Sequence, residues 1–157
     1  MQLIKYLNKA VFTVAYNDAF YEDIQKVGEF AKLAYYADVL VGTVCCKFET
    51  DKNDPTKRTC YIMTLGCLDR YRRVGVGSLL LHHILKQCVK DDTITQVRLH
   101  VQSNNDLAMS FYQKFDFINT GAVASYYKDL TPSDAYLLVK NIEHDLPVTE
   151  GVSKIAI

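Results

Sequence analysis

Residues 72–77, read as RRVGVG, are the part of the chain whose residue types and spacing most directly suggest chemistry. They join a run of β-forming residues to an amphipathic run. Glycines at a helix start let the backbone approach a ligand. The first N–H groups of a helix have no internal partner, and the helix dipole is positive there. With Arg72 and Arg73 beside Gly75 and Gly77, the segment predicts a phosphate-binding turn. A solvated glycine-rich turn explains the same six residues equally well.

The spacing of this segment excludes two common nucleotide motifs. No Gly-Lys-Ser/Thr follows, so the segment is not a Walker loop. The pair Gly75 and Gly77 lacks the third glycine of the dinucleotide fingerprint, and no acidic ribose ligand stands at the usual distance. The choice between ligand site and plain turn therefore depends on the surrounding elements.

Those elements predict one α/β domain over residues 1–142, with a mixed central sheet and helices on both of its faces. A strand–helix–strand unit crosses over right-handed, so strands 61–68 and 96–101 are expected to be parallel. Residues 143–157 contain Pro147 and Gly151 with little amphipathic pattern, and we expect a flexible tail. The other expected strands are 30–36, 39–49, 117–120, 125–130 and 135–142, and the expected helices are 1–10, 17–28, 77–90 and 104–114. In helix 77–90 the apolar residues recur at helical spacing, so one face is expected to be buried: Leu80, Leu81, Ile84, Leu85 and Cys88. In helix 104–114, Leu107, Phe111 and Tyr112 are expected on the inner side.

Composition narrows the class of protein. The 157 residues carry a formal net charge of zero, so nothing indicates a nucleic-acid or membrane-surface protein. The five cysteines lie mostly in apolar strands and form no Cys-x-x-Cys pair, which predicts reduced core thiols in an intracellular protein. The adjacent His82 and His83 point about 100° apart on a helix, so no metal site is expected.

Four segments together carry a family resemblance. The loop 72–77 after its strand, Leu99-His100-Val101, Asn105 and the run 111–117 (FYQKFDF) follow the order typical of the GNAT superfamily of N-acetyltransferases. More specifically, segments 61–68 (YIMTLGCL), 99–102 (LHVQ), 14–18 (VAYND) and 126–128 (YYK) resemble the NatE-type, San-like catalytic subunits of protein N-terminal acetyltransferases. The resemblance spans roughly residues 7–142.

The resemblance implies an acetyl-CoA-dependent transfer to the α-amine of protein or nascent-peptide N-termini, often Met followed by a hydrophobic residue. It implies a partnership with a ribosome-associated NatA-type complex in the cytoplasm, with the nucleus as an open alternative. Carried over by motif, the acetyl-CoA site would comprise Leu65 and Cys67 at the pantetheine, Arg72, Arg73, Gly75 and Gly77 at the pyrophosphate, and Asn105 and Tyr112 near the thioester. The peptide groove would comprise Phe12, Val14, Tyr16, Met63, Tyr126 and Tyr127.

Three side chains are candidates for acid–base chemistry. Tyr61 and His100 lie on strands expected to be neighbours, where they could hold a water that takes the amine proton. Tyr112 could protonate the departing thiolate, and the backbone N–H of Leu65 could meet the oxyanion. Taken alone, His100 is better explained as a hydrogen-bonded structural histidine, and both tyrosines as packing residues.

The chain departs from the family pattern in three places. The family's first strand and half of its first helix have no counterpart in this sequence, so we expect one edge of the sheet to be uncovered. Thr13 stands where the family has proline, so the pocket is expected to be less rigid. Asp116 replaces a glycine, and we expect a left-handed conformation there at mild cost.

Two other functions stay open on the sequence. A lysine or small-amine acetyltransferase would share the acetyl-CoA site and differ in the groove, whose aromatic residues favour an apolar N-terminal residue. A weakly catalytic or non-catalytic accessory subunit is the second alternative, and retention of Tyr61, His100 and Tyr112 argues against it.

Overall fold

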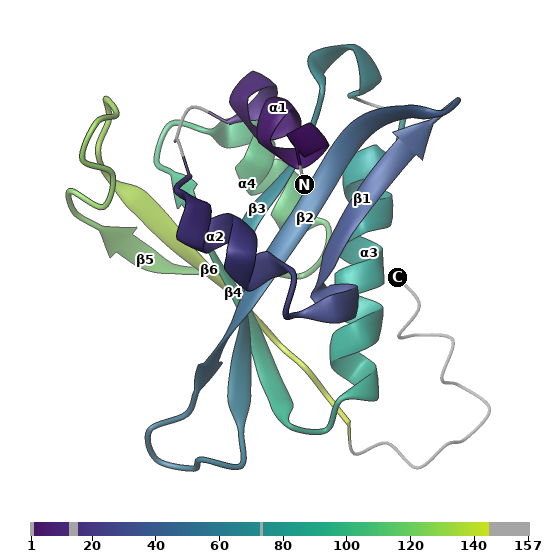
Figure 1. Cartoon of the computed structure of the whole chain (residues 1–157). Coiled ribbons are helices and arrows are strands. Elements are labelled where there is room, and N and C mark those ends of the chain that lie inside the picture. Colours follow the sequence, from purple (N-terminus) through teal and green to yellow (C-terminus); the bar gives the residue numbers. More distant parts are fainter. Residues whose placement is uncertain (1, 13–15, 73, 145–157) are drawn as a thin grey trace.

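The computed structural model describes residues 2–12, 16–72 and 74–144, and it confirms a single α/β fold with helices on both faces of one mixed sheet (Figure 1). Six strands lie in the order β1-β2-β3-β4-β6-β5. The strands are β1 (Ala31–Tyr36), β2 (Val39–Thr50), β3 (Arg58–Cys67), β4 (Ile94–Gln102), β5 (Ile118–Val123) and β6 (Ala135–Asn141). The α-helices are α1 (Gln2–Val11), α2 (Asp18–Ile24), α3 (Val76–Lys90) and α4 (Asp106–Gln113), with short 3-10 turns η1 (Gly28–Phe30) and η2 (Asp69–Tyr71).

The centre of the sheet holds the feature that positions the site. β3 and β4 are parallel, as the crossover through α3 requires, but their pairing runs only from Arg58 opposite Ile94 to Tyr61 opposite Arg98. Beyond that point the two halves of the sheet diverge, toward the top of Figure 1. A β-bulge lies where the divergence begins, because Cys45 and Cys46 of β2 oppose Thr64 and Ile62 and leave Met63 as the extra residue.

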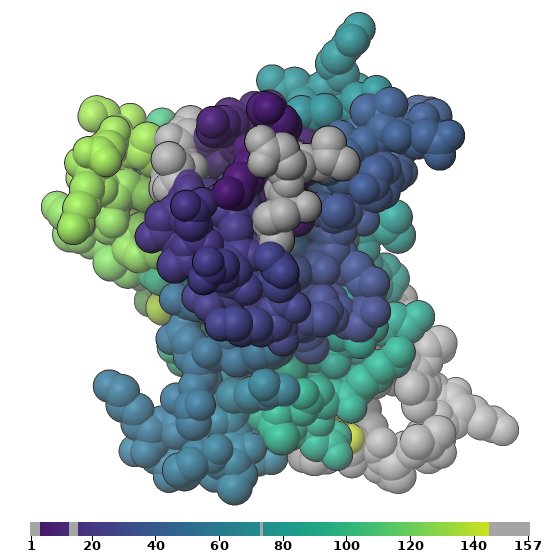
Figure 2. All heavy atoms as spheres, in the orientation of Figure 1, coloured from purple at the N-terminus to yellow at the C-terminus, as the bar shows by residue number. Residues whose placement is uncertain are grey.

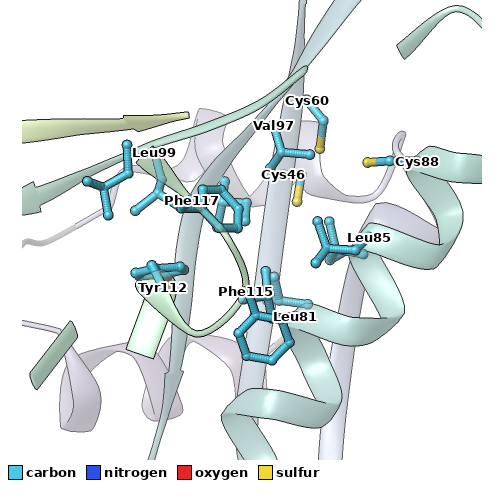
Figure 3. Close-up of a cluster of buried hydrophobic side chains, with 14 of the residues drawn as sticks. Cys46, Cys60, Leu81, Leu85, Cys88, Val97, Leu99, Tyr112, Phe115 and Phe117 are labelled. Atoms are coloured by element: carbon cyan, nitrogen blue, oxygen red, sulfur yellow. The ribbon is translucent and has the colours of Figure 1, made fainter. Parts of the chain in front are cut away.

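One face of the sheet carries the main apolar core beneath α3 and α4. The predicted helical spacing of α3 is confirmed, since Leu80, Leu81, Ile84, Leu85 and Cys88 are all buried. They pack on alternate residues of β3 and β4, and Tyr112, Phe115 and Phe117 close the cluster from the α4 side (Figure 3). Cys46, Cys60 and Cys88 meet inside this core as free thiols.

The opposite face is covered by α1 and α2 over its upper half (Figure 2). Tyr21, Ile24 and Cys45 form a smaller buried cluster there. Asn17 begins α2 by accepting a hydrogen bond from the backbone N–H of Phe20 at 3.0 Å, as its position before the helix predicts.

Two expectations about the C-terminal half are wrong. Residues 125–130 are not a strand: Ser125 has φ +53°, and the Tyr127 N–H donates to the Ser133 carbonyl at 2.8 Å, so the segment folds back on itself as a loop. Leu107 of α4 does not face the apolar core of the protein. Its side chain is 75% exposed, because the short helix turns only Ala108, Met109, Phe111 and Tyr112 toward the sheet.

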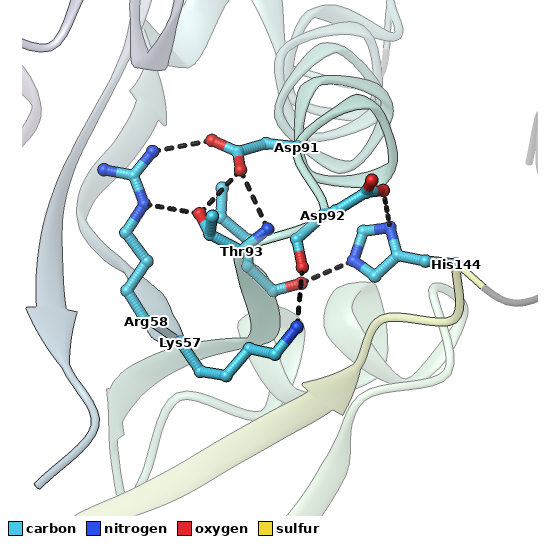
Figure 4. Close-up of polar contacts among 7 residues, drawn as sticks. Lys57, Arg58, Asp91, Asp92, Thr93 and His144 are labelled. Carbon is cyan, nitrogen blue, oxygen red and sulfur yellow. Dashed lines mark hydrogen bonds and ion pairs between the residues drawn. The ribbon is translucent and has the colours of Figure 1, made fainter. Parts of the chain in front are cut away.

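Polar contacts close the lower end of the molecule (Figure 4). Arg58 donates to Asp91 at 2.6 Å, which ties the start of β3 to the end of α3 and explains why β3 begins earlier than predicted. His144 lies within hydrogen-bonding distance of the carbonyls of Val89 and Ile94, at 3.1 and 2.6 Å. The tail predicted for residues 143–157 falls almost wholly outside the described residues. None of the helices within the described ranges is long and apolar enough to cross a membrane.

Candidate active site

The divergence of β3 from β4 frees backbone amides along one edge of β3. The Leu68 N–H donates to the Val41 carbonyl of β2 at 2.8 Å. Because amide directions alternate along a strand, the N–H groups of Leu65 and Cys67 point the other way, into the space that β4 has left. These are the two residues that the family resemblance assigns to pantetheine, and the backbone of β3 directs both N–H groups toward the gap.

The turn at residues 72–77 leads from β3 into α3. Gly75 has φ +88°, a left-handed conformation that favours glycine, and its carbonyl accepts from the Leu79 N–H at 2.9 Å as the first bond of the helix. A Cβ added at Gly77 would meet only ordinary contacts with Phe111, at 3.6 Å or more, so packing does not require glycine there. Arg72 pairs with Asp69 at 3.1 Å, and Arg73 lies outside the described residues.

Tyr61 and His100 meet at the base of the gap. The Tyr61 hydroxyl lies 2.6 Å from His100 Nδ1, just where the β3–β4 pairing ends. Both side chains project from the sheet face that carries α1 and α2, opposite the core residues Ile62 and Leu99. Burial lowers the pKa of His100 and raises the pKa of Tyr61, so both are neutral at physiological pH.

Tyr126 joins this pair, which the sequence did not predict. Its hydroxyl is 2.9 Å from the Tyr61 hydroxyl, and its ring stacks on His100 with centroids 4.0 Å apart and planes 14° apart. The sequence placed Tyr126 in the wall of the peptide groove only. Its contact with Tyr61 spans 65 positions of the chain through an irregular loop, and no local pattern signals such a contact.

Tyr112 lies on the other face of the sheet, in the main apolar core. Its ring is 7% exposed and packs edge-on against Phe117, with centroids 5.4 Å apart. Burial raises the pKa of its hydroxyl. Among the described residues, no hydrogen bond joins Tyr112 to Tyr61 or His100. Asn105 begins the same helix, where its side chain accepts from the Ala108 N–H at 3.1 Å.

Several of the described residues assigned to the peptide groove form one cluster near Tyr126 and Tyr127. Tyr16 stacks on Phe20 with centroids 4.4 Å apart and meets Phe12 edge-on at 6.2 Å. Burial, with Tyr127 close by, raises the pKa of Tyr16 to about 12. Met63 packs in the same cluster. Val14, also assigned to the groove, and Thr13 lie outside the described residues.

The end of α1 is held against the sheet by a close approach at Gly66. A Cβ there would lie 2.5 Å from Val11 and 2.9 Å from the Phe12 ring. Only glycine admits this contact, which fixes Phe12 over β3.

In the ranges that the structure describes, no group of three or more His, Cys, Asp or Glu side chains is arranged to hold a metal ion.

Comparison with known proteins identifies the class. The model of the GNAT acetyltransferase family matches residues 2–117. The solved structure of Arabidopsis thaliana Naa50 in complex with the bisubstrate analogue CoA-Ac-MVNAL superimposes with a TM-score of 0.82 and 43% identity, covering 88% of this chain and 90% of that one. The chain therefore belongs to the GNAT acetyltransferases.

Two curated relatives narrow the type. N-alpha-acetyltransferase 50 of Danio rerio is 48% identical over 139 residues, which are 88% of this chain and 81% of that protein. The probable N-acetyltransferase san of Drosophila melanogaster is 46% identical over 144 residues, 92% of this chain and 77% of that protein. Within its family the chain is an acetyl-CoA-dependent N-alpha-acetyltransferase of the Naa50 and San type.

Proposed function

We propose that this enzyme acetylates the α-amine of protein N-termini that begin with Met followed by a hydrophobic residue. The observation that carries this proposal is the Tyr61–His100 contact, which lies where the β3–β4 pairing ends and close to the aromatic cluster around Tyr16. An apolar first side chain would be buried against Phe12, Tyr16 and Met63. The analogue bound to the Arabidopsis relative carries the peptide MVNAL, which has this type of N-terminus.

Acetyl-CoA would lie in the gap between β3 and β4, within a domain that we take to be residues 1–142. The Leu65 carbonyl and the Cys67 N–H would pair with pantetheine, which leaves the Leu65 N–H for the oxyanion, and the N-terminus of α3 would face the pyrophosphate. Arg72 and Arg73 would add positive charge beside Gly75 and Gly77. Asn105 and Tyr112 would lie nearer the thioester. Leu65, Gly75 and Cys67 fit these roles because their backbone groups point into the gap or open the helix.

Transfer would be direct, within a complex of enzyme and both substrates. Acetyl-CoA supplies a thioester whose carbonyl carbon the free amine attacks. Before or during attack, a water held by Tyr61 and His100 would remove the amine proton, and the neutral state of His100 suits it to accept that proton. The Leu65 N–H would stabilise the oxyanion. Tyr112 would then give its proton to the leaving thiolate and regain one from solvent.

The two alternative functions would require a different arrangement of residues around the acceptor amine. A lysine or small-amine acetyltransferase would need room for a long, polar acceptor, whereas Phe12, Tyr16 and Phe20 form an aromatic wall. An accessory subunit with little activity would not need Tyr61 and His100 held at 2.6 Å. We propose a ribosome-associated NatA-type complex as partner and the cytoplasm as the compartment, in line with the five free thiols.

A peptide panel with acetyl-CoA tests this proposal. Peptides beginning Met-Val or Met-Leu should be acetylated with kcat/KM at least about tenfold above peptides beginning Ser-Glu, the gain expected from burying one apolar side chain. Peptides with a blocked α-amine and one internal lysine are the control. Equal kcat/KM for Met-Leu and Ser-Glu would refute the preference, and comparable rates on the lysine peptides would support the first alternative.

A further inference from the structure

Two backbone hydrogen bonds hold the loop between β5 and β6 so that Tyr126 lies beside the Tyr61–His100 pair. The Ser125 N–H donates to the Asp134 carboxylate at 2.8 Å, and the Tyr127 N–H donates to the Ser133 carbonyl at 2.8 Å. These two bonds flank Tyr126 and fix its backbone. The side chain itself is 40% exposed, so hydrophobic burial alone does not explain its place over His100.

Three arrangements of the protons make both contacts hydrogen bonds, because a hydroxyl oxygen can accept two. A phenol hydroxyl has one proton to donate. If the Tyr126 hydroxyl donates to Tyr61, the Tyr61 proton goes to His100 Nδ1, and the imidazole carries its proton on Nε2. If Nδ1 carries the proton instead, it donates to Tyr61, and Tyr61 then either donates to Tyr126 or accepts from it and turns its own proton to solvent. Only the first arrangement leaves a basic nitrogen bonded to Tyr61.

We propose that Tyr126 is a positioning residue for the proton relay: its hydroxyl donates to Tyr61, which directs the Tyr61 proton onto His100 Nδ1. This inference rests on the proposed function, in which a water bound at Tyr61 passes the amine proton toward His100. When the water gives a proton to the Tyr61 oxygen, the proton already on that oxygen moves to His100 Nδ1. Atoms and charge balance, because His100 becomes an imidazolium and the amine becomes neutral.

Other charged and titratable groups surround the three side chains, and Tyr126→Phe replaces none of them. Lys47 Nζ lies 5.2 Å from the centre of the Tyr61 ring, and Glu49 follows on the same strand. Arg98 shares the face of β4 with His100, and Tyr127 packs edge-on against Tyr126 at 4.9 Å. A change seen on removing one hydroxyl therefore reports that hydroxyl.

The test combines imidazole NMR with kinetics on the full chain. In the parent, the ring nitrogens of His100 should report a proton on Nε2 at about pH 8, where a neutral imidazole is expected. In Tyr126→Phe the ring can still stack on His100, but the hydroxyl that donates to Tyr61 is lost. The two tautomers should then mix, and kcat should fall about 3- to 10-fold, as expected for one neutral hydrogen bond, with KM for acetyl-CoA nearly unchanged. Tyr35→Phe, which removes an exposed hydroxyl on edge strand β1, is the matched control and should change neither readout.

The outcomes separate this inference from the function on which it rests. A Tyr126→Phe variant with the parental tautomer would overturn the positioning role, whether or not kcat falls. A fall limited to peptide KM would also overturn it, since Tyr126 would then act only in binding. If the parent acetylates no peptide, the proposed function fails, while the tautomer comparison still decides how Tyr126 orders Tyr61 and His100.

Discussion

The two faces of β3 and β4 differ in chemistry although they share one backbone. Toward α3 and α4, the strands present Cys60, Ile62 and Leu99, all buried in an apolar core. Toward α1 and α2, the intervening residues Tyr61 and His100 are half-buried and hydrogen-bonded. The period-2 alternation of a strand lets adjacent residues serve stability and catalysis separately. Substitutions on one face should therefore change folding, and those on the other should change rate.

The largest expected effect on stability comes from the apolar face. Ile84 is fully buried on α3, and Ile84→Ala removes methyl and methylene groups from a packed site. We expect a loss of about 3–4 kcal/mol in the free energy of unfolding, measured by urea titration. Leu79→Ala on the same helix is the control, because Leu79 is 69% exposed and should cost well under about 1 kcal/mol. Equal losses from the two variants would contradict the assigned core face.

The thiols of the same core should be chemically inert. Hydrogen bonding with Cys46 together with burial raises the pKa of Cys60, and contact with Cys60 together with burial raises that of Cys88. A raised pKa reduces the thiolate fraction at every pH below it, so alkylation at about pH 8.5 should be about 100-fold slower than in the unfolded chain. Mass spectrometry of partly labelled protein measures the rate at each cysteine. Rapid labelling of Cys60 in the folded protein would show that the alkylating reagent reaches the apolar core, and would contradict its burial.

The smallest effect concerns the turn after α4. Asp116 has φ +66°, which confirms the left-handed conformation expected there. Asp116→Gly should stabilise the protein by about 0.5 kcal/mol, since glycine has no Cβ to clash in this conformation. Asp116→Ala should be less stable than the parent. A melting curve for each variant gives the order of their stabilities. If the parent were more stable than the glycine variant, Asp116 would not be strained in its left-handed conformation.

The sequence predicted most helices and strands, and the approach of Tyr61 to His100, for physical reasons. Helix α3 was predictable from the spacing of Leu80, Leu81 and Ile84, and the parallel β3–β4 pair from the crossover rule. The closeness of Tyr61 and His100 followed from that pairing. These features depend on periodicity or on neighbouring strands, both of which one sequence displays.

What escaped prediction depends on irregular backbone. Residues 125–130 contain β-forming tyrosines, yet Ser125 in a left-handed conformation and the bond from Tyr127 to Ser133 turn them into a loop. The third hydroxyl of the cluster, on Tyr126, was missed for the same reason. Leu107 matched the helical spacing, but α4 is too short to bury it.

The pair Tyr61 and His100 is the centre of this account, and their kinetics test it most directly. Turnover of a Met-Leu peptide at saturating acetyl-CoA should be measured for the parent, Tyr61→Phe, His100→Ala and the control Tyr35→Phe, with melting curves for each. We expect kcat to fall about 100-fold in the first two variants, with smaller changes in KM, because the relay acts in the transition state.

The pH dependence completes this measurement. The parental rate should rise with pH through two ionisations, one of the peptide amine near about 7.7–8.0 and one of His100 below about 6.5, since burial lowers the pKa of that imidazole. His100→Ala should lose the lower ionisation and keep the upper one. If both folded variants retain parental kcat and the lower ionisation persists without His100, the relay is not the source of catalysis.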